Sequence, residues 1–141
     1  MRLHQILRPY LASLFKAVEQ GKTVEDVKPL NIIVITDGEA GDDVESPIKM
    51  CASKLDKLDA PGWQVGIQFF QVGRDEDATR ALQELDDGME ECGVRDIVDT
   101  VPWTSASGRV GLNGDGILKC VLGAVNRKLD RKKVSLESLR R

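Results

Sequence analysis

The chain contains 141 residues, the size of one ordinary domain, which leaves no room for a second folded unit. Apolar residues make up 41% of the sequence and charged residues 30%, proportions typical of a globular protein and not of a disordered or membrane protein. The 20 basic and 23 acidic side chains give a net charge of −3, which argues against nucleic acid as an obligatory partner.

Cysteine usage and the first residues indicate the compartment. Cys51, Cys92 and Cys120 are far apart and odd in number, which argues against a complete disulfide framework. The amino terminus leads directly into an amphipathic pattern without the apolar core of a signal peptide. No later run approaches the roughly 18 apolar residues of a membrane span. We therefore expect a cytoplasmic protein that does not bind a membrane.

The first predicted elements are a helix and a strand. Apolar residues recur every three or four positions from Leu3 to Val18, as on one face of a helix that ends near Gly21. Pro9 either kinks this helix or begins its second segment. The next element, Leu30–Ile35, is a short apolar run without alternation, which predicts a strand covered on both faces.

Two further helix and strand pairs follow. Ser46 and Pro47 fit the N-cap and first residue of a second helix, and residues 65–72 form a second strand. Asp75 or Asp77 caps a third helix. That helix ends near a glycine, Gly93, and a third strand at residues 97–101 comes next.

A loop rich in serine and glycine, residues 104–116, leads to a last predicted helix at residues 117–129. The alternation of helices and strands predicts an α/β fold, a three-layer parallel sheet with helices on both faces. Ligands gather at the carboxyl ends of the strands in such sheets, so we expect the chemistry just after Ile35, Val72 and Val101.

The most informative motif is Thr36-Asp37-Gly38, directly after the first strand. A carboxylate at the end of a buried strand, followed by glycine, can point into the crevice while the backbone turns away. Asp37 is able to ligate a hard cation such as Mg²⁺, to accept a phosphoryl group, or to bond to the amides of its own loop. The residues alone leave these three roles open.

The stretch Leu30–Gly38, with the helix pattern before it and the strand from Trp63 to Val72 after it, resembles the second half of a von Willebrand factor type A (vWA) domain, in particular its fungal intracellular members. The resemblance extends over nearly the whole chain. It implies a Rossmann-like sheet whose three strands correspond to strands 4, 5 and 6 of the order 3-2-1-4-5-6. The vWA-like part is expected at residues 1–133 and a basic carboxyl-terminal tail at residues 134–141.

The vWA resemblance implies a non-enzymatic module that binds proteins through a metal-ion-dependent adhesion site. A D-x-S-x-S motif, a threonine and the aspartate of the T-D-G loop hold the ion in that family, and a carboxylate of the protein partner completes the coordination. The resemblance maps the last aspartate onto Asp37. The sequence contains no D-x-S-x-S motif, so we expect the amino-terminal half of the domain to be missing and Mg²⁺ binding to be weak or absent.

Without that half, residues 32–35 form an uncovered strand edge, which favours self-association or pairing with another chain. The alternatives are a small α/β enzyme or a phospho-aspartate receiver-type domain that uses Asp37, or a truncated gene product without function. No second catalytic partner can be named. Asp42 and Asp43 suit a helix cap, and His4 is expected far from the carboxyl ends of the strands.

Overall fold

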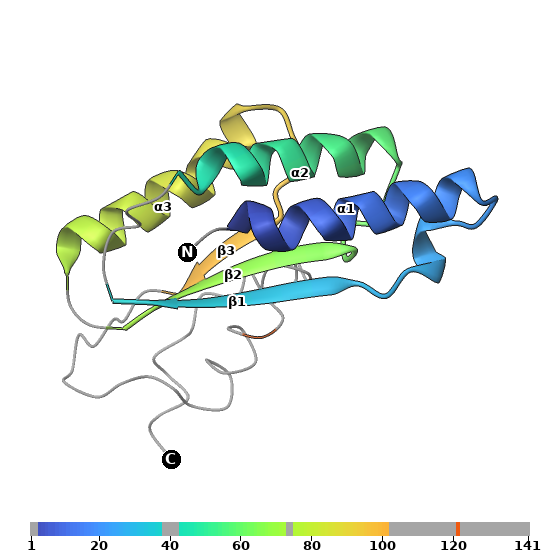
Figure 1. Cartoon of the computed structure of the whole chain (residues 1–141). Helices are drawn as coiled ribbons and strands as arrows, with labels where there is room; N and C mark the ends of the chain where they lie inside the picture. Colours follow the sequence, from blue (N-terminus) through green and yellow to red (C-terminus); the bar gives the residue numbers. More distant parts are fainter. Residues whose placement is uncertain (1–2, 38–42, 73–74, 102–120, 122–141) are drawn as a thin grey trace, which may run out of the picture.

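The computed structural model describes residues 3–37, 43–72, 75–101 and Val121. Helices and strands alternate along this part of the chain (Figure 1). The strands are parallel and lie in the order β1-β2-β3, which confirms an α/β fold with three parallel strands. The elements are α1 (Leu3–Glu19), the short 3-10 helix η1 (Val24–Asp26), β1 (Leu30–Thr36), α2 (Glu45–Lys57), β2 (Val65–Gln71), α3 (Glu76–Glu91) and β3 (Val98–Val101).

The three described α-helices, α1, α2 and α3, cover the same face of the sheet (Figure 1). Both crossovers move in one direction, from β1 to β2 and from β2 to β3, and right-handed crossovers of this kind place their helices on one side. The side-chain amide of Asn31, on the second face, donates a hydrogen bond to the carbonyl oxygen of Val121. Apart from Val121, the loop at 104–116, the helix predicted at 117–129 and the tail at 134–141 lie outside the described residues.

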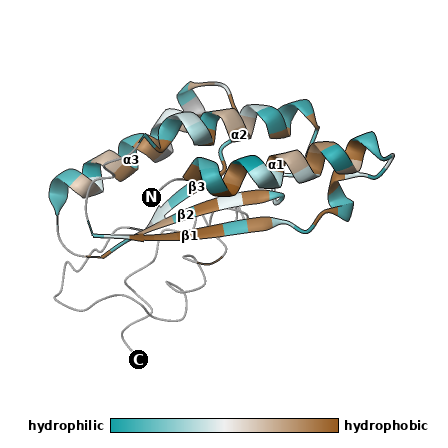
Figure 2. Ribbon diagram, viewed as in Figure 1, coloured by the Kyte–Doolittle hydropathy of each residue, from teal (hydrophilic) through white to brown (hydrophobic). Residues whose placement is uncertain are grey.

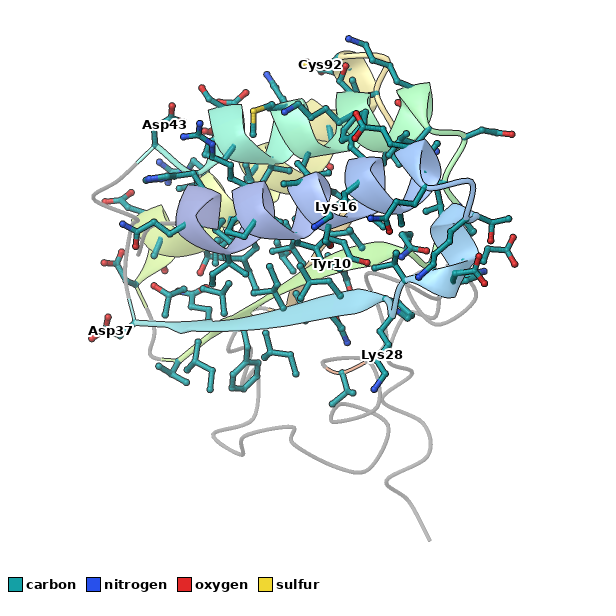
Figure 3. The ribbon with its side chains drawn as sticks, turned by 45° about the vertical axis from the view of Figure 1, so that its right-hand side comes forward. Tyr10, Lys16, Lys28, Asp37, Asp43 and Cys92 are labelled. Carbon is teal, nitrogen blue, oxygen red and sulfur yellow. The ribbon has the colours of Figure 1, made fainter. Side chains whose placement is uncertain are left out.

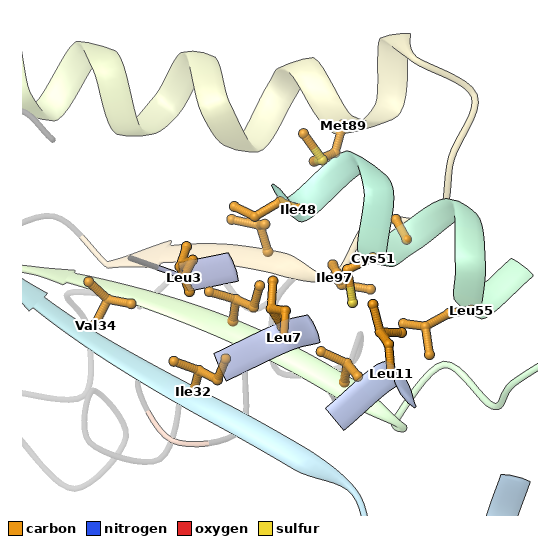
Figure 4. Packing of buried hydrophobic residues seen from close by; sticks show 14 of the residues in the cluster. Leu3, Leu7, Leu11, Ile32, Val34, Ile48, Cys51, Leu55, Met89 and Ile97 are labelled. Carbon is orange, nitrogen blue, oxygen red and sulfur yellow. The ribbon is translucent and has the colours of Figure 1, made fainter. Parts of the chain in front are cut away.

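The hydrophobic core lies between the sheet and the helices (Figure 4). Hydrophobic residues dominate β1 and β2, whereas β3 and the helices carry both hydrophobic and hydrophilic residues (Figure 2). Most of the predicted apolar stripe of α1 is buried, but Ile6 and Val18 are exposed, so this part of the prediction is wrong. The inward faces of α2 and α3 are buried. The most completely buried apolar side chains are Leu3, Leu7, Leu11, Leu14, Ile48, Leu55, Ile67, Met89 and Ile97.

Two of the predicted helix ends are confirmed by backbone geometry. Gly21 and Gly93 have φ angles of +79° and +65°, a region that glycine adopts at little cost and that ends a helix. The carboxylate of Asp75 caps α3 by accepting hydrogen bonds from the amides of Asp77 (3.0 Å) and Ala78 (3.2 Å). Pro9 lies inside α1.

The predicted start of α2 is wrong. The helix begins at Glu45, so Ser46 and Pro47 lie inside its first turn. A carboxylate oxygen of Asp43 accepts a hydrogen bond from the amide of Ser46 (3.0 Å). An acidic side chain just before the helix provides both an acceptor and a charge that suits the helix dipole, which explains the earlier start.

The prediction that β1 is covered on both faces is also wrong. Ile32 and Val34 are buried under the helices, but Ile33 and Ile35 are 44% and 68% exposed. The physical reason is that β1 is an edge strand of the described sheet, whereas every residue of the central strand β2 is buried. An apolar run without alternation therefore does not by itself show that both faces are covered.

Candidate functional site

Asp37 lies where the sequence predicts it, at the carboxyl end of β1 (Figure 3). Parallel pairing between β1 and β2 continues to this point, because the amide of Val72 donates to the carbonyl oxygen of Thr36 (2.7 Å). The side chain of Asp37 is exposed. Its position is therefore fixed by the sheet, and its carboxylate is accessible to a ligand or a partner.

Two other aspartates, Asp43 and Asp75, already have partners in the backbone. The hydrogen bond from the Ser46 amide lowers the pKa of Asp43, and Asp75 caps α3. Within the described ranges, no three His, Cys, Asp or Glu side chains come together to hold a metal ion. The other acidic residues of the loop, Glu39 and Asp42, lie outside those ranges. A Mg²⁺ site on Asp37 thus stays a prediction, as does its weakness.

Gln71 organises the loop that follows β2. Its side chain is fully buried, and its amide nitrogen donates to the carbonyl oxygen of Asp75 (2.8 Å). The hydroxyl of Thr79 donates to Gln71 Oε1 (2.8 Å) and also lies within hydrogen-bond distance of the Asp75 carbonyl oxygen (2.9 Å). These bonds hold the start of α3 against the end of β2. The sequence pattern did not indicate this role for Gln71, because the contacts form only when strand and helix pack.

The far face of β1 presents an apolar surface next to Asp37. We call Ile33, Ile35 and Asp37 the β1 patch. Ile33 and Ile35 are among the exposed large hydrophobic side chains, and they lead along the strand to the exposed carboxylate. Ile35 is in register with Phe70 of β2, which is buried. The sequence signal for this patch is the run Ile32 to Ile35, but a run without alternation predicts a strand that is buried on both faces.

A polar network at the amino-terminal ends of β1 and β2 holds α1 in place. The hydroxyl of Tyr10 donates to the carbonyl oxygen of Lys28 (2.8 Å) and accepts from Gln64 Nε2 (2.7 Å). Gln64 Nε2 also donates to the carbonyl oxygen of Val27 (3.0 Å). Burial raises the pKa of Tyr10, although the Gln64 amide opposes this effect. His4 is an exposed residue of α1.

The two cysteines in the described part are free thiols in different surroundings. Cys51 is buried in the core, and this burial raises its pKa to about 12. Cys92 is exposed at the end of α3. Cys51 therefore acts as a small core residue, as its position on the inward face of α2 predicts. Cys120 lies outside the described residues.

Comparison with known proteins gives no match to a family model, to a curated protein or to a solved structure. Among the described helices, none combines the length and the apolar character that crossing a membrane requires. The resemblance to vWA domains therefore rests on the residues around Asp37 and on the order of the elements.

Proposed function

We propose that the chain is a non-enzymatic protein-interaction module related to the carboxyl half of a vWA domain, with β1, β2 and β3 as its last three strands. The observation that carries this proposal is the β1 patch, in which an exposed carboxylate adjoins exposed isoleucines at the carboxyl edge of the sheet. A surface that combines large apolar side chains with a charge at its rim suits a protein contact.

In this proposal Asp37 contacts the partner directly or through a shared divalent cation. Mg²⁺ is strongly hydrated and needs several fixed oxygen ligands, so one carboxylate binds it poorly. A carboxylate of the protein partner would add a second ligand. We therefore expect no saturable micromolar binding of Mg²⁺ to the chain alone. Calorimetry that detects such binding, and its loss in Asp37→Ala, would contradict this expectation.

The enzymatic alternative has less support. Hydrolysis by a carboxylate pair requires a second carboxylate that is free to act as acid or base within reach of the reacting atoms. The carboxylates of Asp43 and Asp75 bond to helix amides. A receiver-type domain would instead accept a phosphoryl group on Asp37. Incubation with acetyl phosphate and Mg²⁺ separates these possibilities: we expect no phosphorylation, and labelling that is lost in Asp37→Asn would support the receiver.

Site-specific photo-crosslinking tests the interaction itself. A photoreactive amino acid replaces Ile35 in one variant and the exposed Lys57, at the end of α2, in a control. We expect position 35 to form an adduct with another protein in cells, and the adduct to decrease in the Asp37→Ala background. Equal adducts at both positions, or an adduct insensitive to Asp37→Ala, would refute a specific role for the β1 patch.

A further inference from the structure

β1 has a neighbouring strand on only one side within the described sheet. The amide of Leu30 donates to the carbonyl oxygen of Gln64 (2.9 Å), and the carbonyl oxygen of Thr36 accepts from Val72 (2.7 Å). Alternate residues of a parallel strand direct their backbone groups to the same side. The even-numbered residues of β1 therefore face β2, and the N–H and C=O groups of Asn31, Ile33 and Ile35 face the free edge.

These three residues are symmetric about Ile33, which suits antiparallel pairing with an identical strand. If a two-fold axis passes beside Ile33, then Ile33 lies opposite Ile33 of the partner subunit, and Asn31 lies opposite the partner's Ile35. Each of these pairs is of the type that exchanges two N–H···O bonds, so every outward-facing residue of the strand finds a partner. Pro29, which has no amide proton, falls opposite the partner's Asp37, where the ladder ends.

The charges at the ends of β1 favour the same orientation. Lys28 precedes the strand and Asp37 follows it, both side chains are exposed, and they lie at opposite ends of β1 (Figure 3). Antiparallel pairing brings Lys28 of each copy next to the partner's Asp37. Parallel pairing would place like charges together, which is unfavourable. The charge pattern thus selects the arrangement that closes as a two-fold dimer.

The sequence of β1, residues 30–36, contains none of the charged residues or prolines that often protect a sheet edge. In the paired arrangement, the exposed Ile33 would meet Ile33 of the partner subunit on the far face. We propose that two copies of the chain associate by antiparallel pairing of their β1 strands and form one continuous sheet. This inference goes beyond the proposed function because it uses the backbone edge of β1 and Lys28, and needs neither a cation nor another protein.

The first experiment measures the mass of the whole chain by analytical ultracentrifugation from micromolar to millimolar concentration. We expect a concentration-dependent increase from the 15.5 kDa monomer to twice that mass. Lys28→Asp should weaken association about tenfold or more at low salt, and the double exchange Lys28→Asp with Asp37→Lys should restore it. Lys57→Asp, the matched control at the end of α2, should leave the dissociation constant unchanged. A monomer at all concentrations, or the absence of rescue, would overturn the proposal.

The second experiment tests the register, in a background with Cys92→Ser and Cys120→Ser. In the proposed pairing the Cα atoms of residue 33 in the two copies are about 5.5 Å apart, within the range that a disulfide spans. Mild oxidation should therefore link Ile33→Cys into a covalent dimer and should link Ile35→Cys much less, because its opposite residue is Asn31. Equal linking of both variants would overturn this register. Both readouts detect the chain with itself, so they are independent of the crosslinks to another protein that test the proposed function.

Discussion

The two faces of β1 contain the same kinds of side chain in different surroundings. Ile32 and Val34 face the helices and are 9% and 7% exposed, whereas Ile33 and Ile35 face the other way and are largely exposed. The far face of β2 is nevertheless buried at Gln68 and Phe70. The comparison shows that the position of a strand in the sheet, and not its hydrophobicity alone, decides burial, and that the apolar surface left over on the edge strand is available for association.

The largest expected effect contrasts the helix face with the far face. Leu7→Ala removes a fully buried side chain from the core and should lower the free energy of unfolding by about 2 to 5 kcal/mol. Ile35→Thr keeps a β-branched side chain at an exposed position and should change the free energy of unfolding by less than about 0.5 kcal/mol. Urea unfolding at low protein concentration measures both values. Similar losses in the two variants would show that the far face of β1 is part of the core.

Two buried glutamines, Gln64 and Gln68, allow a matched test, because they differ in the hydrogen bonds that their side chains make. Gln64 Nε2 donates two hydrogen bonds, so Gln64→Met should cost about 1 to 3 kcal/mol. Gln68 is fully buried on the far face, and neither of its side-chain polar atoms has a hydrogen-bond partner among the described residues. Gln68→Met should therefore stabilise the chain by about 1 kcal/mol. Destabilisation by Gln68→Met would mean that this amide is paired, and the contrast between the two positions would fail.

A smaller effect is expected for Arg95, which connects the turn before β3 to the end of α2 and the loop that follows it. Its guanidinium donates to the carboxylate of Asp56 and to the carbonyl oxygens of Ala60 and Pro61, between the end of α2 and the turn before β3. Arg95→Ala should lower the free energy of unfolding by about 1 kcal/mol, since the ion pair is partly exposed. Arg80→Ala, which breaks an exposed pair with Asp77, is the control and should have a smaller effect. Equal effects would show that Arg95 contributes no more than a surface charge.

The smallest expected effect concerns the start of α2. The Ser46 amide lowers the pKa of Asp43 below the ordinary value of 3.8, so the carboxylate stabilises the fold above that value and loses this effect as the pH falls through the lowered pKa. Asp43→Ala should therefore lower the melting temperature slightly at pH 6, and the difference from the wild type should shrink as the pH falls below 3.8. A difference that stays constant from pH 6 to pH 2 would exclude this linkage.

Part of the candidate site was predictable because it depends on neighbours in the chain. Asp37 follows an apolar strand, and its place at the carboxyl end of β1 was correctly predicted from that local pattern. The finding that no three potential metal ligands come together in the described part was not predictable in the same way. Asp43 and Asp75 have carboxylates like that of Asp37, but the start of α2 and the start of α3 occupy them. Which acidic group stays accessible depends on where each helix begins.

The sequence by itself determined the order of helices and strands, the parallel α/β class and the helix ends at Gly21 and Gly93, because periodicity and left-handed glycines act over a few residues. Only the tertiary structure decided which face of β1 is covered. It also decided that Gln64 bonds to Tyr10, 54 residues away in the sequence. Such contacts depend on how the layers pack, and no short stretch of sequence contains that information.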